Sequence, residues 1–530
     1  MSGWRIKSAA TLVGLAALAL GACAKREAPE AQLLRISQRN EPATLDPHLA
    51  TLPDEFFVIR ALAEGLLVPH PNGGAPLPGA AESWSVSADG LHYTFKLRRE
   101  ARWSNGEPLT ARDFLFSFER VLNPALGAPK AALFYAVKNA QAYHLGELKQ
   151  FADVGFAAPD DYTLTLELAE PAPHLPALAA SGPWLPVPRT VVEKSGRSTS
   201  RENNWARAGN HVGNGPFVLT EWRKNQHLLV QPNRYYHAAA RLHLEGVRFQ
   251  VYDSGDTEER SFRAGQVDVT MAVPATKLEA YTSPTLRRQP LHETRYLALN
   301  LTVPPLNDPR VRRALSLAID RTALVQNVLR GGQRPAANFV PPGLGDYAGY
   351  ERIATDPAAA RLLLEQAGFP QGANFPRLEL TSWGVNPSVL EAIQQMWRRE
   401  LGIDIRIVQR EGKVHMAALL AGDFALAFMP AIPDYDDPAA IFGELTTGAT
   451  GNFPRWSSPR FDRLVADATR TSDPVRRNAL YRDAEETLLA ELPVIPLYFN
   501  FQNYLVAPRV RDWRQDALWN RYYLDTSLDP

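Results

Sequence analysis

The strongest constraint on the fold is a series of capped helices that alternate with strands from about residue 294. The segment "NDPRVRRALSLAIDRTALVQNVLRGG" predicts one helix, with Asp308 as its N-cap, Pro309 at its first position and Gly331 beyond its end. The segment "DPAAARLLLEQAGFP" repeats this pattern, and "RLELTSW", "IDIRIV" and "DFALAFMPAI" predict strands around a helix over residues 388–401. This alternation predicts an α/β lobe with a largely parallel sheet.

The earlier part of the chain predicts a different mixture of elements. Residues 91–98 alternate between apolar and polar side chains, which indicates a half-buried strand, and residues 160–171 show the same alternation. Residues 214–236 predict a β-hairpin. Thr110 and Asp113 form a capping-box-like pair at the start of a helix. We therefore expect a second α/β part, and a cleft between two such lobes is a common ligand site.

Length, charge and motifs limit the class of protein. A chain of 530 residues is too long for a single core, so we expect roughly two or three domains. Lys plus Arg and Asp plus Glu number 57 each, so the basic bias of a nucleic-acid-binding protein is missing. The sequence contains no G-x-S-x-G, H-E-x-x-H, Walker A or CxxC pattern. We predict no enzyme activity, no metal site, no cofactor and no nucleic-acid partner.

The N-terminus has the pattern of a lipoprotein signal peptide over residues 1–22. Arg5 and Lys7 precede an apolar segment at residues 9–20, which is too short to span a bilayer comfortably. Small residues before Cys23 resemble the lipobox of bacterial lipoproteins, in which the cysteine is lipidated and becomes the first mature residue. Cys23 is the only cysteine of the chain, so we predict lipidation at Cys23 and no disulfide. A plain signal peptide with an incidental cysteine is the alternative.

The predicted location follows from the same region. Residues 23–32 are polar and are expected to tether the folded part to a membrane. Ala24 stands where an aspartate would resemble an inner-membrane retention signal, which favours the outer membrane. We therefore expect a lipid-anchored protein in the periplasmic space, or on the extracellular face of a cell with one membrane.

Several motifs in order along the chain resemble one protein family. They are "EPATLDPH", "AEGLL", "YTFKLRREARWSNGEPLTARDF", "NGPFVLTEW", "NRYY", "NDPRVRRALSLAIDR", "FPRWSSPRFDRLV" and "LPVIPLYFNFQNYLV". Together they resemble the extracytoplasmic solute-binding proteins of ABC transporters, in the oligopeptide- and dipeptide-binding family (bacterial solute-binding protein family 5). The resemblance runs from about residue 33 to the C-terminus.

The resemblance implies the two-lobed periplasmic-binding-protein fold of class II, in its large three-domain form, with mixed β-sheets flanked by helices. The implied domains are a lobe I main domain (residues 33–64, 188–293 and 501–530), a lobe I accessory domain (residues 65–187) and lobe II (residues 294–500). The implied function is the lipid-anchored component of an ABC importer, which captures extended oligopeptides between its lobes as a monomer and delivers them to permease and ATPase subunits. A non-standard solute (a modified peptide, a murein fragment, haem or a metal chelate) and a peptide-sensing role are the alternatives.

The acidic segment "AIPDYDDPAAIFG" carries the candidate anchor for a ligand. Three carboxylates lie within four positions of one another: Asp434, Asp436 and Asp437. Because like charges this close repel, each should require a nearby cation or hydrogen-bond donor. In the oligopeptide-binding branch, the aspartate of an Asp-Tyr-x-x-Pro motif pairs with the α-ammonium of the peptide, and Asp434 is the matching residue. For Asp436 and Asp437 we favour capping of a helix that begins near Pro438.

The family also binds the peptide backbone as an added strand. The resemblance assigns this role to the strand from Phe428 to Ile432 and to the loop from Leu52 to Asp54, with Tyr296 and Asn500 as further cleft-lining residues. For Tyr296 and Asn500, core packing is the alternative.

The sequence departs from the family pattern on that strand. Pro430 has no N–H to offer, and Phe428 occupies a position that resembles the family's arginine for a peptide carboxylate. Either longer peptides run past this region, or another cation such as Arg295 or Arg330 takes over.

Overall fold

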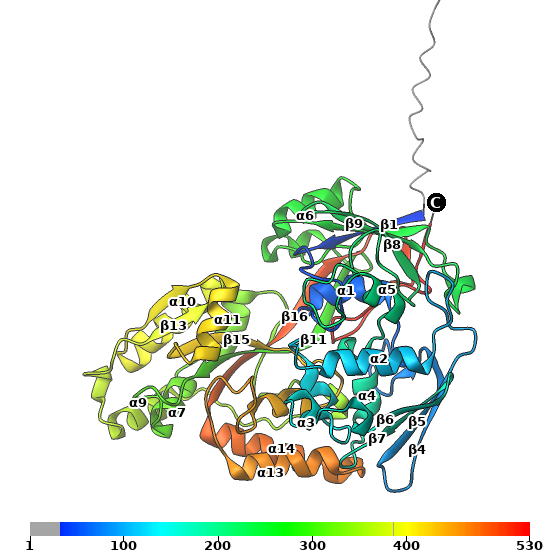
Figure 1. Cartoon of the computed structure of the whole chain (residues 1–530). Helices are drawn as coiled ribbons and strands as arrows, with labels where there is room; N and C mark the ends of the chain where they lie inside the picture. The colour runs from blue at the N-terminus through cyan, green and yellow to red at the C-terminus, as the bar shows by residue number, and fades with distance from the viewer. Residues whose placement is uncertain (1–31, 385, 530) are drawn as a thin grey trace, which may run out of the picture.

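The computed structural model describes residues 32–384 and 386–529, so the predicted signal peptide, Cys23 and the tether up to residue 31 lie outside the described residues. Figure 1 shows two lobes, with β11 and β16 running between them. The lobe near the N-terminus contains a four-stranded sheet in the order β1-β10-β9-β8. Its strands are β1 (Leu33–Gln38), β10 (Gly246–Val251), β9 (His227–Pro232) and β8 (Phe217–Arg223). The predicted hairpin is therefore β8 and β9.

A second antiparallel sheet belongs to the predicted accessory domain. Its order is β4-β5-β7-β6, from β4 (Ala81–Val86), β5 (His92–Leu97), β7 (Thr163–Glu167) and β6 (Phe156–Asp160). Helix α2 (Ala111–Leu122) covers this sheet and begins at the predicted capping box, where Thr110 N donates to Asp113 at 2.8 Å. Phe118 of α2 lies at the centre of an aromatic core with Phe134 and Trp184.

The other lobe is built on a six-stranded sheet in the order β12-β16-β11-β15-β13-β14. Its strands are β12 (Arg334–Pro335), β16 (Val494–Leu505), β11 (Leu286–Leu299), β15 (Leu426–Ala431), β13 (Glu379–Ser382) and β14 (Arg406–Gln409). The prediction of a largely parallel sheet is wrong. Within the described residues, the sheet is mixed: the pairs β13–β14 and β13–β15 are parallel, and the pairs β11–β15, β11–β16 and β12–β16 are antiparallel.

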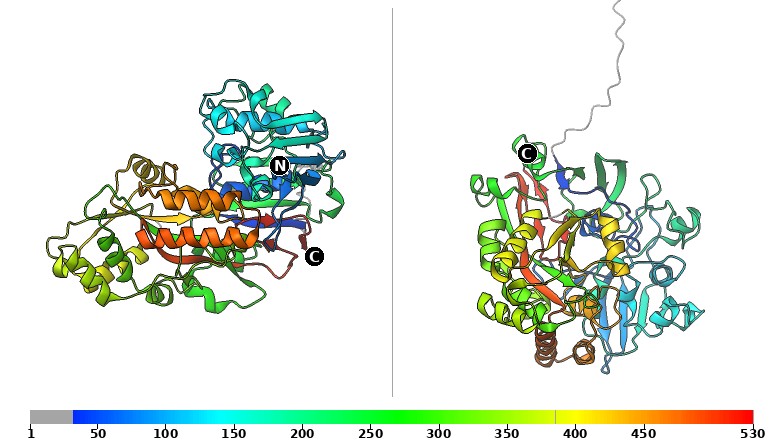
Figure 2. Two further views of the ribbon diagram at one scale, coloured as in Figure 1. Left: turned by 90° about the horizontal axis from the view of Figure 1, so that it is seen from below. Right: turned by 90° about the vertical axis from the view of Figure 1, so that its left-hand side faces the viewer.

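Helices cover both faces of this sheet. Leu297 and Phe428 face a core shared with α7 (Pro309–Leu317), α9 (Pro357–Gln366) and α10 (Pro387–Leu401). Residues of the opposite face, Tyr296 and Met429, join a core with α13 (Pro459–Arg470) and α14 (Pro474–Glu491), which lie side by side in Figure 2. That second core also includes the accessory domain, so the accessory domain packs against this lobe.

Strands β11 and β16 pair along most of their length but shift register between Pro290 and Thr294. A bulge of this kind bends the ladder locally. The predicted domain boundaries at residues 293/294 and 500/501 lie at this irregularity.

The helix caps show one error in the sequence prediction. Asp308 accepts from Arg310 N at 2.8 Å and begins α7, as expected. The helix ends at Leu317, however, and Asp320 caps a new turn by accepting from Ala323 N at 2.8 Å. The single predicted helix is therefore α7 followed by α8 (Arg321–Ala323) and the turn Leu324–Leu329.

Short elements connect these layers. Helices include α1 (Pro53–Leu62), α3 (Ala140–His144), α4 (Leu175–Ala179), α5 (Arg189–Lys194), α6 (Gly255–Arg263), α11 (Gly412–Ala421) and α12 (Ala439–Phe442). Two-stranded pairs are β2 (Leu67–Val68) with β3 (Leu77–Pro78), β17 (Val510–Arg511) with β20 (Ser527–Leu528), and β18 (Arg514–Gln515) with β19 (Arg521–Tyr522).

Two sequence motifs contact each other at the end of α1. Asn214 of "NGPF" donates from Nδ2 to Glu64 O at 2.7 Å and accepts from Glu64 N at 3.1 Å. Gly213 and Gly215 pass so close to the backbone of Leu62 and Ala63 that a Cβ would clash. Hydrogen bonds and close backbone packing therefore hold the "AEGLL" segment against "NGPF", which gives these two motifs a structural role.

A buried ion pair connects the N-terminal loop to the accessory domain. The guanidinium of Arg120 on α2 donates to both oxygens of Asp46, at 3.0 and 2.5 Å. Trp205 Nε1 and His48 N complete the shell of donors around that carboxylate.

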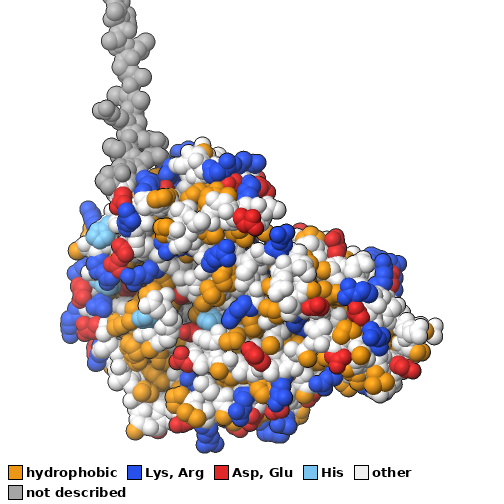
Figure 3. Space-filling view, turned by 180° about the vertical axis from the view of Figure 1, so that it is seen from behind, with side chains coloured by type: hydrophobic (Ala, Val, Ile, Leu, Met, Phe, Trp, Pro, Cys, Tyr) orange, Lys and Arg blue, Asp and Glu red, His pale blue; other side chains and the backbone are white. Residues whose placement is uncertain are grey.

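The surface carries charges of both signs. Figure 3 shows Lys, Arg, Asp and Glu interspersed over the face seen from behind. Over the described part of the chain, no helix combines the length and the apolar character that a membrane crossing needs.

Candidate functional site

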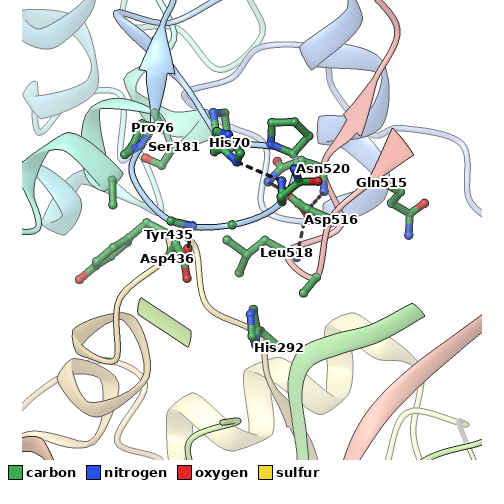
Figure 4. Close-up of a pocket in the computed structure, with 18 of the residues that line it drawn as sticks. His70, Pro76, Ser181, His292, Tyr435, Asp436, Gln515, Asp516, Leu518 and Asn520 are labelled. Carbon is green, nitrogen blue, oxygen red and sulfur yellow. Dashed lines mark hydrogen bonds between the residues drawn. The ribbon is translucent and has the colours of Figure 1, made fainter. Parts of the chain in front are cut away.

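A cavity of about 540 Å³ lies where the lobes meet. Several parts of the chain line it: Arg60 with residues 69–76, residues 177–181 at the end of α4, Gln289, Gly343 and Asp346, residues 434–436, and residues 515–520 near the C-terminus. His292, at the register shift of β11, closes it from the side of the second lobe (Figure 4). The cavity is therefore bounded by all three predicted domains.

The C-terminal wall of the cavity is held rigidly by one carboxylate. Asp516 accepts from Asn520 Nδ2 at 2.7 Å, from Leu518 N at 2.9 Å and from the Tyr522 hydroxyl at 2.7 Å. Burial raises the pKa of Asp516 by more than these hydrogen bonds lower it, so the pKa lies above its ordinary value. The wall therefore presents a fixed, fully hydrogen-bonded loop, and Asp516 has few acceptor sites left for a ligand.

The three carboxylates of the acidic segment all have partners inside the protein. Asp434 Oδ2 accepts from Lys130 Nζ of the accessory domain at 2.7 Å. Asp436 accepts from the backbone N–H of Gly74 at 3.2 Å and of Gly345 at 2.8 Å, so it bridges two segments and does not cap a helix.

Asp437 behaves as predicted for a helix cap. Its Oδ1 accepts from Ala439 N at 2.9 Å, at the first residue of α12, and from the Tyr481 hydroxyl at 2.7 Å. Asp437 is buried and faces α14, on which Tyr481 lies. Its role is to fix the segment that carries Asp434.

Further contacts cross from the accessory domain to the second lobe. The His174 ring stacks on Tyr435 with centroids 5.8 Å apart, and Glu170 pairs with Arg470 at 2.8 Å on the surface. Together with the Lys130–Asp434 pair, they join the accessory domain to the second lobe.

Strand β15 offers an unpaired edge next to the cavity. Strand β13 pairs with it only at Leu426 and Ala427, so within the described residues Phe428–Ala431 pairs with a strand on the β11 side alone. Ile432 follows this edge and is half-buried. Pro430 lies within the edge and reduces its donors, as the sequence predicts.

Two predicted contact residues lie mostly in the core. Phe428 is 0% exposed and packs on Trp383, so it offers no surface to a ligand in this conformation. Tyr296 is buried edge-on against Phe339. In this conformation, Phe428 and Tyr296 therefore pack in the core and do not contact a ligand site.

The remaining predicted contact residues lie apart from the cavity lining. Asn500 is half-buried and accepts from Phe501 N at 2.9 Å. Leu52, which is 51% exposed, precedes α1, and Asp54 accepts from Asn40 Nδ2 at 2.5 Å. None of these three lines the 540 Å³ cavity, whereas Asp434 does.

The two candidate cations for a ligand carboxylate differ in environment. The Arg295 guanidinium pairs with buried Glu293 at 2.6 Å and lies 5.9 Å from the ring centroids of Trp383 and Phe428. Arg330 is exposed in a left-handed conformation after the turn at residue 329. Arg295 is therefore already neutralised by its neighbour.

Most of the cavity wall could not be identified from the sequence. Residues 69–76 and 515–520 of the lining carry no motif of their own, and Lys130, the partner of Asp434, lies 304 positions from it in the chain. Only the proline- and glycine-rich composition of residues 69–76 could have indicated a loop. No group of His, Cys, Asp and Glu side chains within the described residues is arranged to hold a metal ion.

Comparisons with known proteins agree on one family. Residues 75–453 match the model of bacterial extracellular solute-binding proteins, family 5 Middle. The chain is 32% identical over 493 residues to the probable deoxycholate-binding periplasmic protein YgiS of Escherichia coli, covering 90% of each chain. It is 30% identical over 528 residues to the periplasmic oligopeptide-binding protein OppA of the same organism, covering 97% of this chain and 96% of that protein.

The solved structures add information on conformation. The murein tripeptide binding protein MppA of Escherichia coli, 30% identical, covers 94% of this chain and 99% of its own with a TM-score of 0.83. The unliganded open form of MppA reaches a TM-score of 0.72. Over the whole chain, this structure is therefore more similar to the first MppA structure than to the unliganded open form.

Proposed function

Because the chain belongs to family 5 of the bacterial extracellular solute-binding proteins, we propose that it binds an oligopeptide or a modified peptide between its lobes and delivers it to an ABC permease. The observation that carries this proposal is the interlobe cavity of about 540 Å³, which three predicted domains enclose. Sites for small ligands typically measure about 300–1,000 Å³. The names of OppA and MppA, which bind oligopeptides and a murein tripeptide, support a peptide as the ligand class.

The proposed mode of binding is strand addition on the free edge of β15. A peptide that pairs there gains backbone hydrogen bonds that do not depend on its sequence. Pro430 limits the number of these bonds, so side-chain and end-group contacts carry a larger share of the affinity. Ile432 borders the bound ligand on this side, and exposed Leu52 with the half-buried start of α1, Pro53 and Asp54, borders it on the other.

Transport then proceeds without chemistry in this chain. The lobes close about β11 and β16, whose register shift supplies the bend. The closed form docks on permease subunits, and ATP is hydrolysed by a separate subunit. We propose that Cys23 is lipidated and holds the protein in the periplasmic space at a membrane, with the outer membrane favoured.

A second candidate is a solute other than an unmodified peptide. The specific observation in its favour is that Asp434, the expected anchor for an α-ammonium, is occupied by Lys130. The names of MppA and YgiS also show that relatives bind a murein tripeptide and are assigned deoxycholate.

The test is a thermal shift of the delipidated, ligand-stripped protein against pools of di- to octapeptides, with murein tripeptide, deoxycholate and haem as separate samples. A ligand at about 100 times its Kd stabilises the folded state by ~2.7 kcal/mol, which is visible as a raised Tm. Peptide pools are expected to raise Tm. A folded protein that no peptide pool shifts would overturn peptide binding, and a shift by another sample would identify the second candidate.

Matched variants place the ligand in the cavity. Ala177 lines the cavity, so Ala177→Trp should fill it and abolish the shift. Ala240 is exposed on a turn away from the cavity, so Ala240→Trp should leave the shift unchanged. Equal shifts for both variants would place the ligand elsewhere.

A further inference from the structure

We propose that Lys130 is a built-in counter-cation for Asp434, so that this protein binds ligands with a blocked or uncharged amino end about as well as ligands with a free ammonium. The inference rests on the proposed function, because it concerns the specificity of the same site. Its basis is the 2.7 Å contact between Lys130 Nζ and Asp434 Oδ2, which joins the accessory domain to the acidic segment of the second lobe.

The geometry places the Lys130 ammonium where a ligand ammonium is expected. Asp434 lines the interlobe cavity, and one of its carboxylate oxygens already has a cationic donor. Both side chains are about one-quarter exposed, at 29% for Lys130 and 26% for Asp434, so the pair is partly shielded from water. A ligand ammonium must therefore displace Lys130 or share a neutralised carboxylate.

Lys130 is held in its charged form. Burial opposes its protonation, but the charge and hydrogen bond of Asp434 outweigh burial and raise the pKa of Lys130 above its ordinary value. The ammonium is therefore present at neutral pH and neutralises Asp434 in this structure.

The neighbouring carboxylates do not replace Asp434 as an anchor. Asp436 accepts from Gly74 N and Gly345 N. Asp437 is buried under Tyr481. Within the acidic segment, Asp434 is therefore the carboxylate that could discriminate between amino ends.

Exchange of one ammonium for another at the same carboxylate yields little net affinity. A ligand ammonium gains a charge-assisted hydrogen bond, but Lys130 loses an equivalent one. Lys130 is the cation that pairs with the partly buried Asp434 among the described residues, so without it a ligand ammonium gains its full contact. Removal of Lys130 should thus create a preference for free amino ends.

The experiment compares the Kd values of one peptide in free and N-acetylated form, measured by calorimetry on the full mature protein. For the wild type, the ratio of the two Kd values is expected within about threefold. For Lys130→Met, the free form is expected to bind at least about tenfold more tightly than the acetylated form, because each tenfold corresponds to ~1.4 kcal/mol. Lys130→Arg keeps the cation and should keep the wild-type ratio.

Control variants separate specificity from lobe closure. Arg470→Met removes another pair between the same two units, Glu170–Arg470, neither member of which lines the cavity. An effect on lobe closure changes the Kd of the free peptide and the Kd of the N-acetylated peptide by the same factor. The ratio of these two Kd values for Arg470→Met should therefore equal the wild-type ratio. Adding Asp434→Asn to Lys130→Met should return the ratio to within about threefold, since the anchor is then gone.

Three outcomes decide the matter. A wild-type preference for the free form of tenfold or more overturns the inference, and so does a ratio that Lys130→Met leaves unchanged. Lys130→Gln, checked by its melting curve, replaces Lys130→Met if the latter does not fold. If a folded wild type binds neither form of any pool peptide, the proposed function fails and this inference falls with it.

Discussion

Removal of one partner of the buried pair Asp46–Arg120 should be among the most destabilising single substitutions in the fold. Arg120 donates two bonds to Asp46 and a third, from Nε, to Ser198 O at 2.7 Å. The side chains are 4% and 1% exposed, so neither charge has water to replace a lost partner. Loss of one partner of such a pair typically costs about 3–5 kcal/mol. Arg120→Met is therefore expected to lower the free energy of unfolding by about that amount.

A control on the same helix isolates the effect of burial. Arg112 of α2 pairs with Asp161 at 3.3 Å, but these side chains are 76% and 58% exposed. Exposed pairs contribute about 0–1 kcal/mol, so Arg112→Met should change stability by less than ~1 kcal/mol. The two variants share the helix, the substitution and the type of partner, and differ in exposure.

The assay is equilibrium unfolding in urea, followed by circular dichroism and by tryptophan fluorescence, whose transitions must coincide for one free energy to apply. The double variant Asp46→Asn/Arg120→Met should be less destabilised than the sum of the single variants, because the second change removes a charge that the first has left unpaired. Equal effects of Arg120→Met and Arg112→Met, or strict additivity of the double variant, would refute the reasoning.

Two further predictions concern the same lobe. Burial and the nearby Arg120 guanidinium lower the pKa of His48 from 6.5 to about 3; the unfolded chain therefore binds this proton first, and stability is lost as pH falls below 6.5. This group alone lowers the free energy of unfolding by about 1.4 kcal/mol for each pH unit between pH 6.5 and about 3. Urea unfolding at several pH values in this range should show that the free energy of unfolding of His48→Gln changes less with pH than that of the wild type. An equal pH dependence would contradict the prediction. At Gly215 a Cβ would lie 2.5 Å from Ala63 N, whereas at Gly412 nothing lies within 4 Å. Gly215→Ala should therefore lower Tm through a clash of about 1–3 kcal/mol, while Gly412→Ala should leave it unchanged or raise it, and similar Tm values would contradict this account.

Local signals predicted the elements that depend on local chemistry. The N-caps at Asp308 and Asp356 were predictable because a side-chain oxygen and the backbone it caps are neighbours in the chain. The same logic explains the error beyond Leu317, where Asp320 provides a second N-cap signal that ends one helix and begins another. The apolar periodicity alone could not locate that break.

Strand direction was not predictable from the pattern. Strands β11 and β15 flank several helices, which is typical of parallel sheets, yet they pair antiparallel. Strand β16 comes from the far end of the chain and inserts between β11 and β12. A hydrophobic pattern reports which face of a strand is buried, but it carries no information on which distant strand lies beside it.

The site shows the same division between local and distant information. Asp437 caps α12 through Ala439, two positions away, and the sequence predicted that role. The partner of Asp434 is Lys130, which belongs to another domain, and no pattern near either residue indicates the contact. Charges that are close in sequence reveal that partners are needed, but only the fold decides whether those partners are ligands or the protein itself.

The contacts of the acidic segment also bear on how the lobes close. Lys130–Asp434 and Gly74–Asp436 both join the accessory domain to the second lobe, so both must break when these units separate. Once separated, water solvates the freed charges well, and partly exposed pairs of this kind contribute only about 0–1 kcal/mol. These contacts therefore align the closed lobes without holding them shut. The remaining free energy of closure must come from the apolar packing between the accessory domain and the second lobe and from the ligand, and only the ligand's share makes closure depend on loading.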